Sequence, residues 1–181
     1  MRFTPTNLHG AWLIDLEPHW DERGFFARSY CERELADRGL APVHAQCNVS
    51  WNPKRGTLRG LHFNAPPHEE AKIVRCTSGA ILDVIVDLRR ASSTHLAWTA
   101  VELDAQSRRM LYVPPGFAHG FLTLRDDSEV SYQMSAPYVP SAARGIRWND
   151  PRLAIAWPHE PALISERDAG YPDYDLDAAE S

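Results

Sequence analysis

The sequence predicts an all-β fold built as a small barrel, and three observations support this. Short apolar runs recur along the chain, and turn signals separate them at the spacing of about 8–12 residues that is typical of sandwiches and barrels. The 181 residues include 14 prolines, which disfavour long helices. In the first half of the chain only residues 32–38 have the pattern of a short helix, with Gly39 placed to end it. We therefore expect a single domain over residues 1–181, with roughly the last ten residues as a loose tail.

Several elements are expected before the barrel itself. Residues 11–14 form an apolar strand, residues 21–24 a turn, and residues 25–30 a second strand. Residues 46–51 form a further strand, and the Asn-Pro and Gly of 52–56 form its turn. The strands expected after this turn are 58–63, 71–76, 80–88, 97–103, 109–113, 118–124 and 129–134. Residues 141–181 are rich in Pro, Asp and Ala, so only short elements are expected there.

Composition and charge narrow the range of functions. A net charge of −5 and a pI near 5.9 argue against a nucleic-acid partner, although they allow a local basic pocket for an anion. No apolar run approaches the ~20 residues of a membrane span, and the N-terminus lacks a signal-peptide core. Cys31, Cys47 and Cys76 are odd in number, widely spaced and without a CxxC pair. The cysteine pattern therefore predicts reduced thiols and a location in the cytoplasm. The lack of a long apolar run predicts no membrane partner.

The segment 56–62 places an arginine and a histidine in a strand that is otherwise rich in glycine and leucine. Alternation along a strand puts Arg59 and Leu61 on one face and His62 on the other. A charge and an imidazole in such a segment need partners, and a ligand can supply them. A surface arginine and a hydrogen-bonded core histidine are the alternative, and the segment by itself does not separate the two. In the strand 80–88, Asp83 and Asp87 are interpreted as facing solvent or capping a turn.

The stretch 114–121 follows an apolar strand and has the pattern P-x-G-x-x-H. This pattern resembles the second motif of the cupin superfamily. The resemblance implies a double-stranded β-helix, or jelly-roll barrel, with a few short helices, in which the turn directs His119 into the barrel mouth.

A metal site is not expected. Metal-binding cupins carry two histidines one residue apart, because imidazoles at that spacing lie on one strand face and can share an ion. Here His62 is followed at the matching place by Asn64, and the nearby His68, Glu69 and Glu70 lie in a Pro-Pro turn. We therefore predict no metal and no other cofactor, with a metal-dependent cupin isomerase or oxygenase as the alternative.

Without a metal, His62, Lys72 and a partner carboxylate suit proton transfer. A neutral imidazole can take a proton near pH 7 when a carboxylate fixes its tautomer and stabilises the cation. An ammonium group can stabilise an enolate oxygen, and a tyrosine on the opposite wall can return a proton. Together these groups suit the removal of a proton next to a ketone and its replacement from the other side, which is epimerisation.

A wider resemblance covers about residues 10–170. It is carried, in order, by 21–26 (DERGFF), 46–50 (QCNVS), 56–62 (GTLRGLH), 71–72 (AK), 83–89 (DVIVDLR), 115–121 (PGFAHGF), Tyr132, Tyr138, 145–148 (GIRW) and 165–168 (SERD). On these residues the chain resembles the dTDP-4-dehydrorhamnose 3,5-epimerase family, whose members are isomerases of nucleotide sugars. The resemblance implies epimerisation of a nucleotide-diphosphate 4-keto-6-deoxyhexose at C3 and C5. It also implies a homodimer that exchanges an N-terminal strand.

The resemblance implies roles for individual residues. His62 would be the base paired with Asp168, Lys72 would stabilise the enolate, and Tyr132 would be the acid. The substrate-binding positions are Arg23, Phe26, Arg28, Gln46, Asn48, Arg59, His119, Tyr138 and Arg167, with arginines on the diphosphate and Tyr138 stacked on the base. Taken alone, the two tyrosines read as barrel aromatics and Asp168 as a helix-start residue.

Departures from the family pattern concern specificity. Arg28 and Ala143 stand where the family often has glutamate, and Arg167 replaces a frequent lysine. Asn64 and Glu70 replace frequent glutamines. A guanidinium only donates hydrogen bonds, which suits the N3 of cytosine rather than thymine, so a CDP-linked sugar is a second candidate substrate. An epimerase acting at C3 or C5 only, and a sugar-binding cupin without turnover, are also compatible with the sequence.

Overall fold

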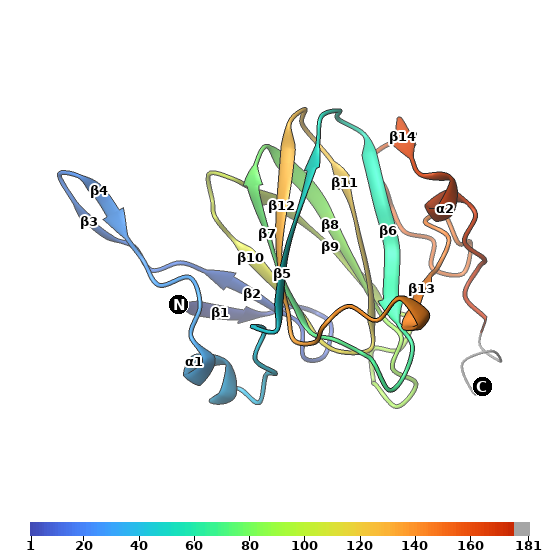
Figure 1. Ribbon diagram of the computed structural model, residues 1–181, viewed down its shortest axis with the longest axis horizontal. Helices are drawn as coiled ribbons and strands as arrows, with labels where there is room; N and C mark the ends of the chain where they lie inside the picture. The colour runs from blue at the N-terminus through green and yellow to red at the C-terminus, as the bar shows by residue number, and fades with distance from the viewer. Residues whose placement is uncertain (176–181) are drawn as a thin grey trace.

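The computed structural model describes residues 1–175, in which two mainly antiparallel sheets face each other as a barrel (Figure 1). The elements are β1 (Arg2–Pro5), β2 (Trp12–Asp15), β3 (His19–Asp21), β4 (Gly24–Phe26), α1 (Glu32–Ala36), β5 (Gln46–Asn52), β6 (Thr57–Asn64), β7 (Lys72–Ser78), β8 (Ala80–Asp87), β9 (Trp98–Asp104), β10 (Met110–Val113), β11 (Phe117–Thr123), β12 (Ser128–Met134), a 3-10 turn (Pro140–Ala142), β13 (Ala143–Gly145), β14 (Leu163–Ile164) and α2 (Glu166–Ala169). The first sheet has the order β1-β2-β10-β7-β12-β5. The second has the order β13-β6-β11-β8-β9, and β14 pairs with β6.

The predicted all-β jelly-roll fold is confirmed, and the strands expected between residues 46 and 134 are present. The expected strand 25–30 is wrong beyond Phe26, because the hairpin of β3 and β4 ends with the pair His19 and Phe26 and offers residues 27–30 no partner. No helix in the described residues is long and apolar enough to span a membrane. One domain over 1–181 stays a prediction, and much of the predicted tail, 176–181, lies outside the described residues.

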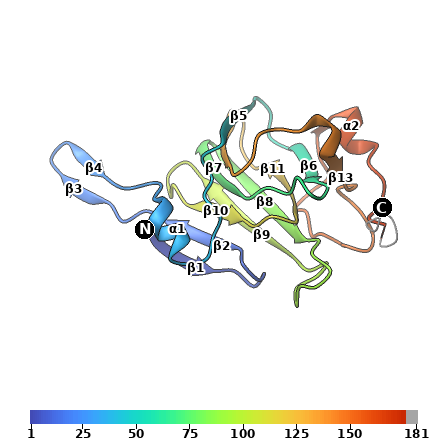
Figure 2. The ribbon, with the colours of Figure 1, turned by 60° about the horizontal axis from the view of Figure 1, so that its bottom comes forward.

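The space between the two sheets is filled by apolar side chains from both. Val74 and Val130 come from the first sheet, and Ile85 and Phe121 from the second. A separate apolar cluster lies on the outer face of the second sheet, where Leu61 packs with side chains of the C-terminal segment. The chain after β12 therefore covers this outer face and brings α2 to the edge of β6 (Figures 1 and 2).

An irregularity between β6 and β11 corrects the predicted direction of Arg59. The register pairs His62 with His119 but Arg59 with Phe121, so three steps on β6 match two on β11, as in a β-bulge. The backbones also approach closely here, because a Cβ at Gly60 (φ +131°) would lie 2.5 Å from the Cα of Gly120. Arg59 consequently does not share the outward face of Leu61.

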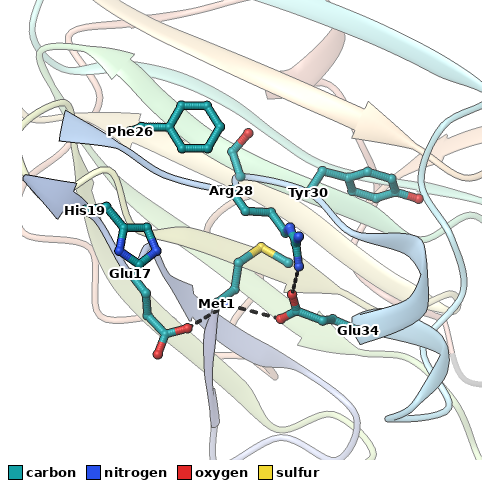
Figure 3. A pocket seen from close by; sticks show the side chains of 8 residues that line it. Met1, Glu17, His19, Phe26, Arg28, Tyr30 and Glu34 are labelled. Carbon is teal, nitrogen blue, oxygen red and sulfur yellow. Dashed lines mark hydrogen bonds and ion pairs between the residues drawn. The ribbon is translucent and has the colours of Figure 1, made fainter.

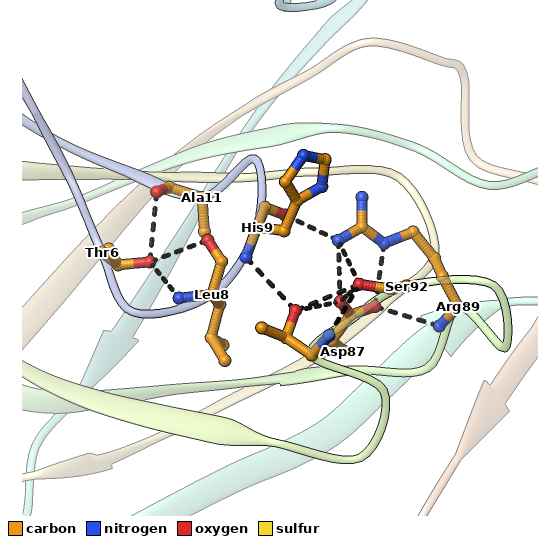
Figure 4. A network of polar contacts seen from close by, with 8 residues as sticks. Thr6, Leu8, His9, Ala11, Asp87, Arg89 and Ser92 are labelled. Atoms are coloured by element: carbon orange, nitrogen blue, oxygen red, sulfur yellow. Dashed lines mark hydrogen bonds and ion pairs between the residues drawn. The ribbon is translucent and has the colours of Figure 1, made fainter.

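Asp87 ends β8 and is the centre of a buried polar network (Figure 4). Its carboxylate accepts hydrogen bonds from the backbone and guanidinium of Arg89 and from the hydroxyls of Ser92 and Thr94. Asp87 thus caps the turn after the strand, which is one of the two predicted roles, but it does not face solvent. Burial alone would raise the pKa of Asp87, but these hydrogen bonds outweigh it and lower the pKa from 3.8 to about 2.

The stability of the protein is therefore expected to fall as the pH falls from about 4 to about 2. Because the folded pKa of Asp87 is depressed, its contribution is complete above the unfolded pKa and is lost as the pH falls through the folded one. Asp87→Asn should lower the free energy of unfolding at pH 7 by on the order of 2 kcal/mol and flatten its pH dependence in this window. Urea unfolding of both proteins at several pH values measures this. An unchanged pH slope in the variant would contradict it.

Candidate active site

A histidine–aspartate pair forms at the edge of β6. Ser165 caps α2 by accepting a hydrogen bond from the backbone N–H of Asp168 at 3.1 Å, so Asp168 lies in the first turn of the helix. One carboxylate oxygen of Asp168 lies 2.8 Å from Nε2 of His62. The other accepts the backbone N–H of Gly60 at 3.0 Å. Both oxygens are occupied, which fixes the carboxylate in place.

The electrostatics of this pair define which nitrogen of His62 can act. Burial alone would raise the pKa of Asp168, but the hydrogen bonds from His62 and from the Gly60 N–H help to outweigh it, and that pKa is lowered. An ionised carboxylate accepts the proton on Nε2, which leaves the lone pair on Nδ1. The His62 side chain is 42% exposed and that of Asp168 only 7%. Nδ1 of an accessible imidazole is thus the basic atom.

Lys72 begins β7 and shares its inward face with Val74 and Cys76, which lie in the core between the sheets. Its Nζ lies 3.2 Å from Oε1 of Glu70, and the two side chains are 11% and 8% exposed. The arrangement holds an ammonium group, with one carboxylate beside it, inside the barrel. In the sequence Glu70 is considered only where a metal site is excluded and as a departure from the family pattern, and no role is predicted for it there.

Tyr132 lies in β12, opposite Asn48 of β5. Its hydroxyl is 3.3 Å from that of Ser50, and its ring meets the ring of His119 edge-on at 6.1 Å between centroids. Burial raises the pKa of Tyr132, against a smaller lowering by the Ser50 hydrogen bond. The phenol therefore keeps its proton at neutral pH and can donate it.

His119 lies directly opposite His62 on the neighbouring strand, so both side chains share the inward face. Its Nε2 is 2.7 Å from a carboxylate oxygen of Asp83, and both residues are buried. The interpretation of Asp83 as facing solvent or capping a turn is wrong. Asp83 has the same parity as the core residues Ile81 and Ile85, so strand alternation directs it inward.

Other predicted binding residues lie around this group. Arg59 donates from Nε to Oδ1 of Asn52 on the opposite sheet at 2.7 Å, and the charge of Arg59 slightly lowers the pKa of Tyr132. Gln46 donates to Asn48 at 3.0 Å. Arg59 is thus on the inner face with the other groups.

Exposed side chains of Tyr138 and of Arg167 on α2 lie beside the pair of His62 and Asp168. The backbone N–H of Tyr138 donates to Oε1 of Gln46 at 3.0 Å, and Tyr138 is 56% exposed. The nearby side chains of Tyr171 and Tyr138 raise the pKa of Arg167. This side of the site therefore carries two of the predicted binding residues, Tyr138 and Arg167.

Three predicted binding residues are not brought to this site within one chain. Arg23 and Phe26 belong to the hairpin of β3 and β4, which projects from the end of the molecule away from β6 and α2 in both views (Figures 1 and 2). Arg28 donates to Glu34 at 2.9 Å and lines a cavity of about 680 Å³ beside this hairpin, with Met1 and His19 among its other residues (Figure 3). Its guanidinium is engaged by a carboxylate of its own chain.

The arrangement offers a base, a buried ammonium and a protonated phenol around one interior. Among residues 1–175, no three His, Cys, Asp or Glu side chains gather in a way that could hold a metal ion. Partners that sequence reasoning did not assign are Ser50, Asn52, Glu70, Asp83 and Tyr171. Ser50 belongs to a stretch that carries the resemblance, and Asp83 had a signal in its strand parity.

Comparisons with known proteins agree with one another. The profile of the dTDP-4-dehydrorhamnose 3,5-epimerase family matches residues 5–175. A dTDP-4-dehydrorhamnose 3,5-epimerase of Methanothermobacter thermautotrophicus is 42% identical, over 94% of this chain and 92% of that protein. A dTDP-4-dehydrorhamnose 3-epimerase of Streptomyces niveus is 40% identical, over 93% of this chain and 81% of that one. The crystal structure of a 3,5-epimerase from Legionella pneumophila, in complex with dTDP-4-keto-L-rhamnose, is 32% identical with a TM-score of 0.91, covering 99% of this chain and 95% of that one.

Proposed function

The chain belongs to the dTDP-4-dehydrorhamnose 3,5-epimerase family, and from this we propose that it is an isomerase that converts dTDP-4-dehydro-6-deoxy-D-glucose to dTDP-4-dehydro-L-rhamnose. The observation that carries the proposal is the pair of His62 and Asp168, with Nδ1 of an accessible imidazole left as the base. Lys72 and Tyr132 supply the ammonium and the acid from the first sheet.

The proposed reaction inverts each carbon through an enolate. Nδ1 of His62 takes the proton from the carbon next to the C4 ketone, and the C–H electron pair moves into the ring as the C4 oxygen becomes an enolate. Asp168 stabilises the imidazolium that forms, and the ammonium of Lys72 stabilises the enolate oxygen. Tyr132 donates its proton to the opposite face of the same carbon. Solvent then takes the proton from His62 and returns one to the phenolate, so the cycle needs no cofactor.

The substrate is proposed to lie between the chain's own inner face and a partner. Arg59, Gln46, Asn48, His119, Tyr138 and Arg167 would come from one subunit. Arg23 and Phe26 would come from the projecting hairpin of the second copy in a homodimer, and Arg28 from the segment that follows this hairpin. The supporting observations are that the side chain of Arg23 is 86% exposed, that Phe26 is 78% exposed, and that their hairpin projects away from β6 of its own chain (Figure 1).

A mixture of two inactive variants tests this exchange. We expect Arg23→Ala and His62→Ala, each nearly inactive alone, to recover roughly a quarter of wild-type activity when they are mixed and refolded, because half of the dimers then hold one intact site. His62→Ala mixed with Lys72→Ala is the matched control and should recover nothing, since both residues serve the site of one chain. No recovery with Arg23→Ala would place Arg23 in the site of its own subunit.

Proton exchange in D2O, followed by NMR, tests the proposed reaction. The dTDP-linked 4-keto-6-deoxyglucose should take up deuterium at both C3 and C5, and its CDP counterpart should not. Deuterium at C3 alone would give the reaction named for the Streptomyces niveus relative, and exchange only with CDP would move the substrate to that nucleotide. No exchange in folded protein would leave a binding protein.

Elemental analysis of the same sample tests the predicted absence of a metal. Location in the cytoplasm stays a prediction.

Tyr132→Phe should separate the two halves of the reaction. Without the phenolic proton, proton removal by His62 continues, but donation to the opposite face is lost. Solvent exchange at C3 or C5 should therefore persist while net epimerisation falls by about 100-fold or more. NMR of the substrate in D2O reports both rates in one experiment. Equal losses in the two rates would count against Tyr132 as the acid.

A further inference from the structure

We propose that Tyr171 is a positioning residue for His62, holding the imidazole ring in the plane that joins Nε2 to Asp168. The inference deepens the proposed function, because it assumes that His62 is the base. Tyr171 follows Asp168 by three residues, just beyond the end of α2. One short segment thus supplies both the carboxylate and the ring that meet His62.

The contact between the two rings is well defined. The centroids of His62 and Tyr171 are 5.9 Å apart, and their planes stand at 74°, an edge-to-face arrangement. The guanidinium of Arg167 lies 5.7 Å from the centre of the same tyrosine ring. The hydroxyl of Tyr171 is buried and makes no hydrogen bond to His62. The aromatic ring, rather than the hydroxyl, is therefore the part of Tyr171 that meets His62.

Gly145 of the neighbouring strand β13 leaves room for the ring of Tyr171. Gly145 of β13 lies directly opposite His62 in the register of β6 and β13. A Cβ on Gly145 would meet three carbons of the Tyr171 ring, the nearest at 2.2 Å. The backbone at Gly145 does not have the positive φ that would by itself favour glycine. The lack of a side chain at this position therefore serves to admit the tyrosine ring beside His62.

His62 needs such support because a single hydrogen bond leaves its ring free to turn. Its side chain is 42% exposed, and the second side-chain torsion of histidine has a broad, two-fold preference. A flipped ring would put the Cε1 carbon where Nε2 now meets Asp168, so the hydrogen bond would be lost, and Nδ1 would point away from the substrate. A packed aromatic edge restricts that rotation, and proton transfer is sensitive to the alignment of the base.

The first test needs no substrate. Nitrogen-15 NMR of the histidine side chains in the ligand-free protein should show His62 as the single Nε2–H tautomer in the wild type and in Tyr171→Phe. Tyr171→Ala should give averaged or exchange-broadened nitrogen signals, because both ring orientations become populated. An unchanged His62 signal in Tyr171→Ala would overturn the proposal, whatever the reaction turns out to be.

The kinetic test separates positioning from binding. Tyr171→Ala should lower kcat for deuterium entry by about tenfold or more and leave KM within about twofold, whereas Tyr171→Phe should keep both. If Tyr171→Ala does not fold, Tyr171→Leu replaces it, because leucine keeps apolar volume without a planar edge. A wild-type level of kcat in the folded Ala or Leu variant would overturn the proposal. Absence of exchange in the wild type would count against the proposed function alone, and the NMR test would still decide the role of Tyr171.

Gly145→Ala approaches the same contact from the other side. Its new methyl group should displace the Tyr171 ring and lower kcat to the level of Tyr171→Ala. The double variant Gly145→Ala with Tyr171→Ala should be no worse than Tyr171→Ala alone, because the displaced ring is already absent. Losses that multiply in the double variant would show that Gly145 acts independently of Tyr171 and would contradict the proposal.

Discussion

His62→Ala is expected to abolish deuterium entry at both C3 and C5, with a loss of about 10³–10⁴-fold or more. In the proposed mechanism Nδ1 of His62 is the base for both carbons, because Nε2 is hydrogen-bonded to Asp168. NMR of the substrate in D2O resolves the two carbons separately. Binding of dTDP should be nearly unchanged, since the imidazole is expected to contact the sugar.

Asp168→Asn is the matched variant, since it keeps the size and shape of the side chain. An amide can donate a hydrogen bond to Nε2, which favours the tautomer with its proton on Nδ1 and removes the basic lone pair from the substrate side. We expect a loss similar to that of His62→Ala.

Exchange that persists at one carbon in His62→Ala would contradict a single base. His119, directly opposite His62, would then be the residue to examine at that carbon.

The barrel and its strands followed from the sequence, because alternation and turn residues are local signals. The direction of Arg59 did not follow, because it depends on an irregular pairing between β6 and β11 that no local pattern in 56–62 reveals. Asp83 shows the reverse case. Its parity with Ile81 and Ile85 was visible, but a lone carboxylate in an apolar strand is expensive to bury, and its partner His119 is 36 residues away.

The candidate site was predicted through resemblance rather than through physical reasoning from the residues. His62 and Asp168 are 106 residues apart, and nothing in the sequence between them indicates that they meet. Tyr171 and Gly145 lie outside or at the margin of the stretches that carry the resemblance, and their contact depends on how the segment after β12 folds over the edge of β6. Such contacts depend on tertiary packing, which short-range patterns do not encode.

Lys72→Met is expected to lower kcat by on the order of 10²–10³-fold with little change in KM, because the ammonium acts on charge that develops only in the enolate. Methionine keeps most of the apolar length of lysine and removes the charge. Steady-state kinetics of epimerisation, with calorimetric binding of dTDP as a measure of the ground state, report the two effects separately. A loss confined to KM would instead make Lys72 a binding residue.

Glu70 provides the internal control for this interpretation. In Lys72→Met the carboxylate of Glu70, 8% exposed, is left without its ammonium partner and adds an unfavourable negative charge near the enolate. Adding Glu70→Gln to Lys72→Met should therefore recover part of the lost kcat, whereas Glu70→Gln alone should leave the ammonium in place and keep or raise kcat. If the double variant is no better than Lys72→Met, the Glu70 carboxylate does not influence the enolate. The pair would then be structural, holding the start of β7 rather than setting the electrostatics of the reaction.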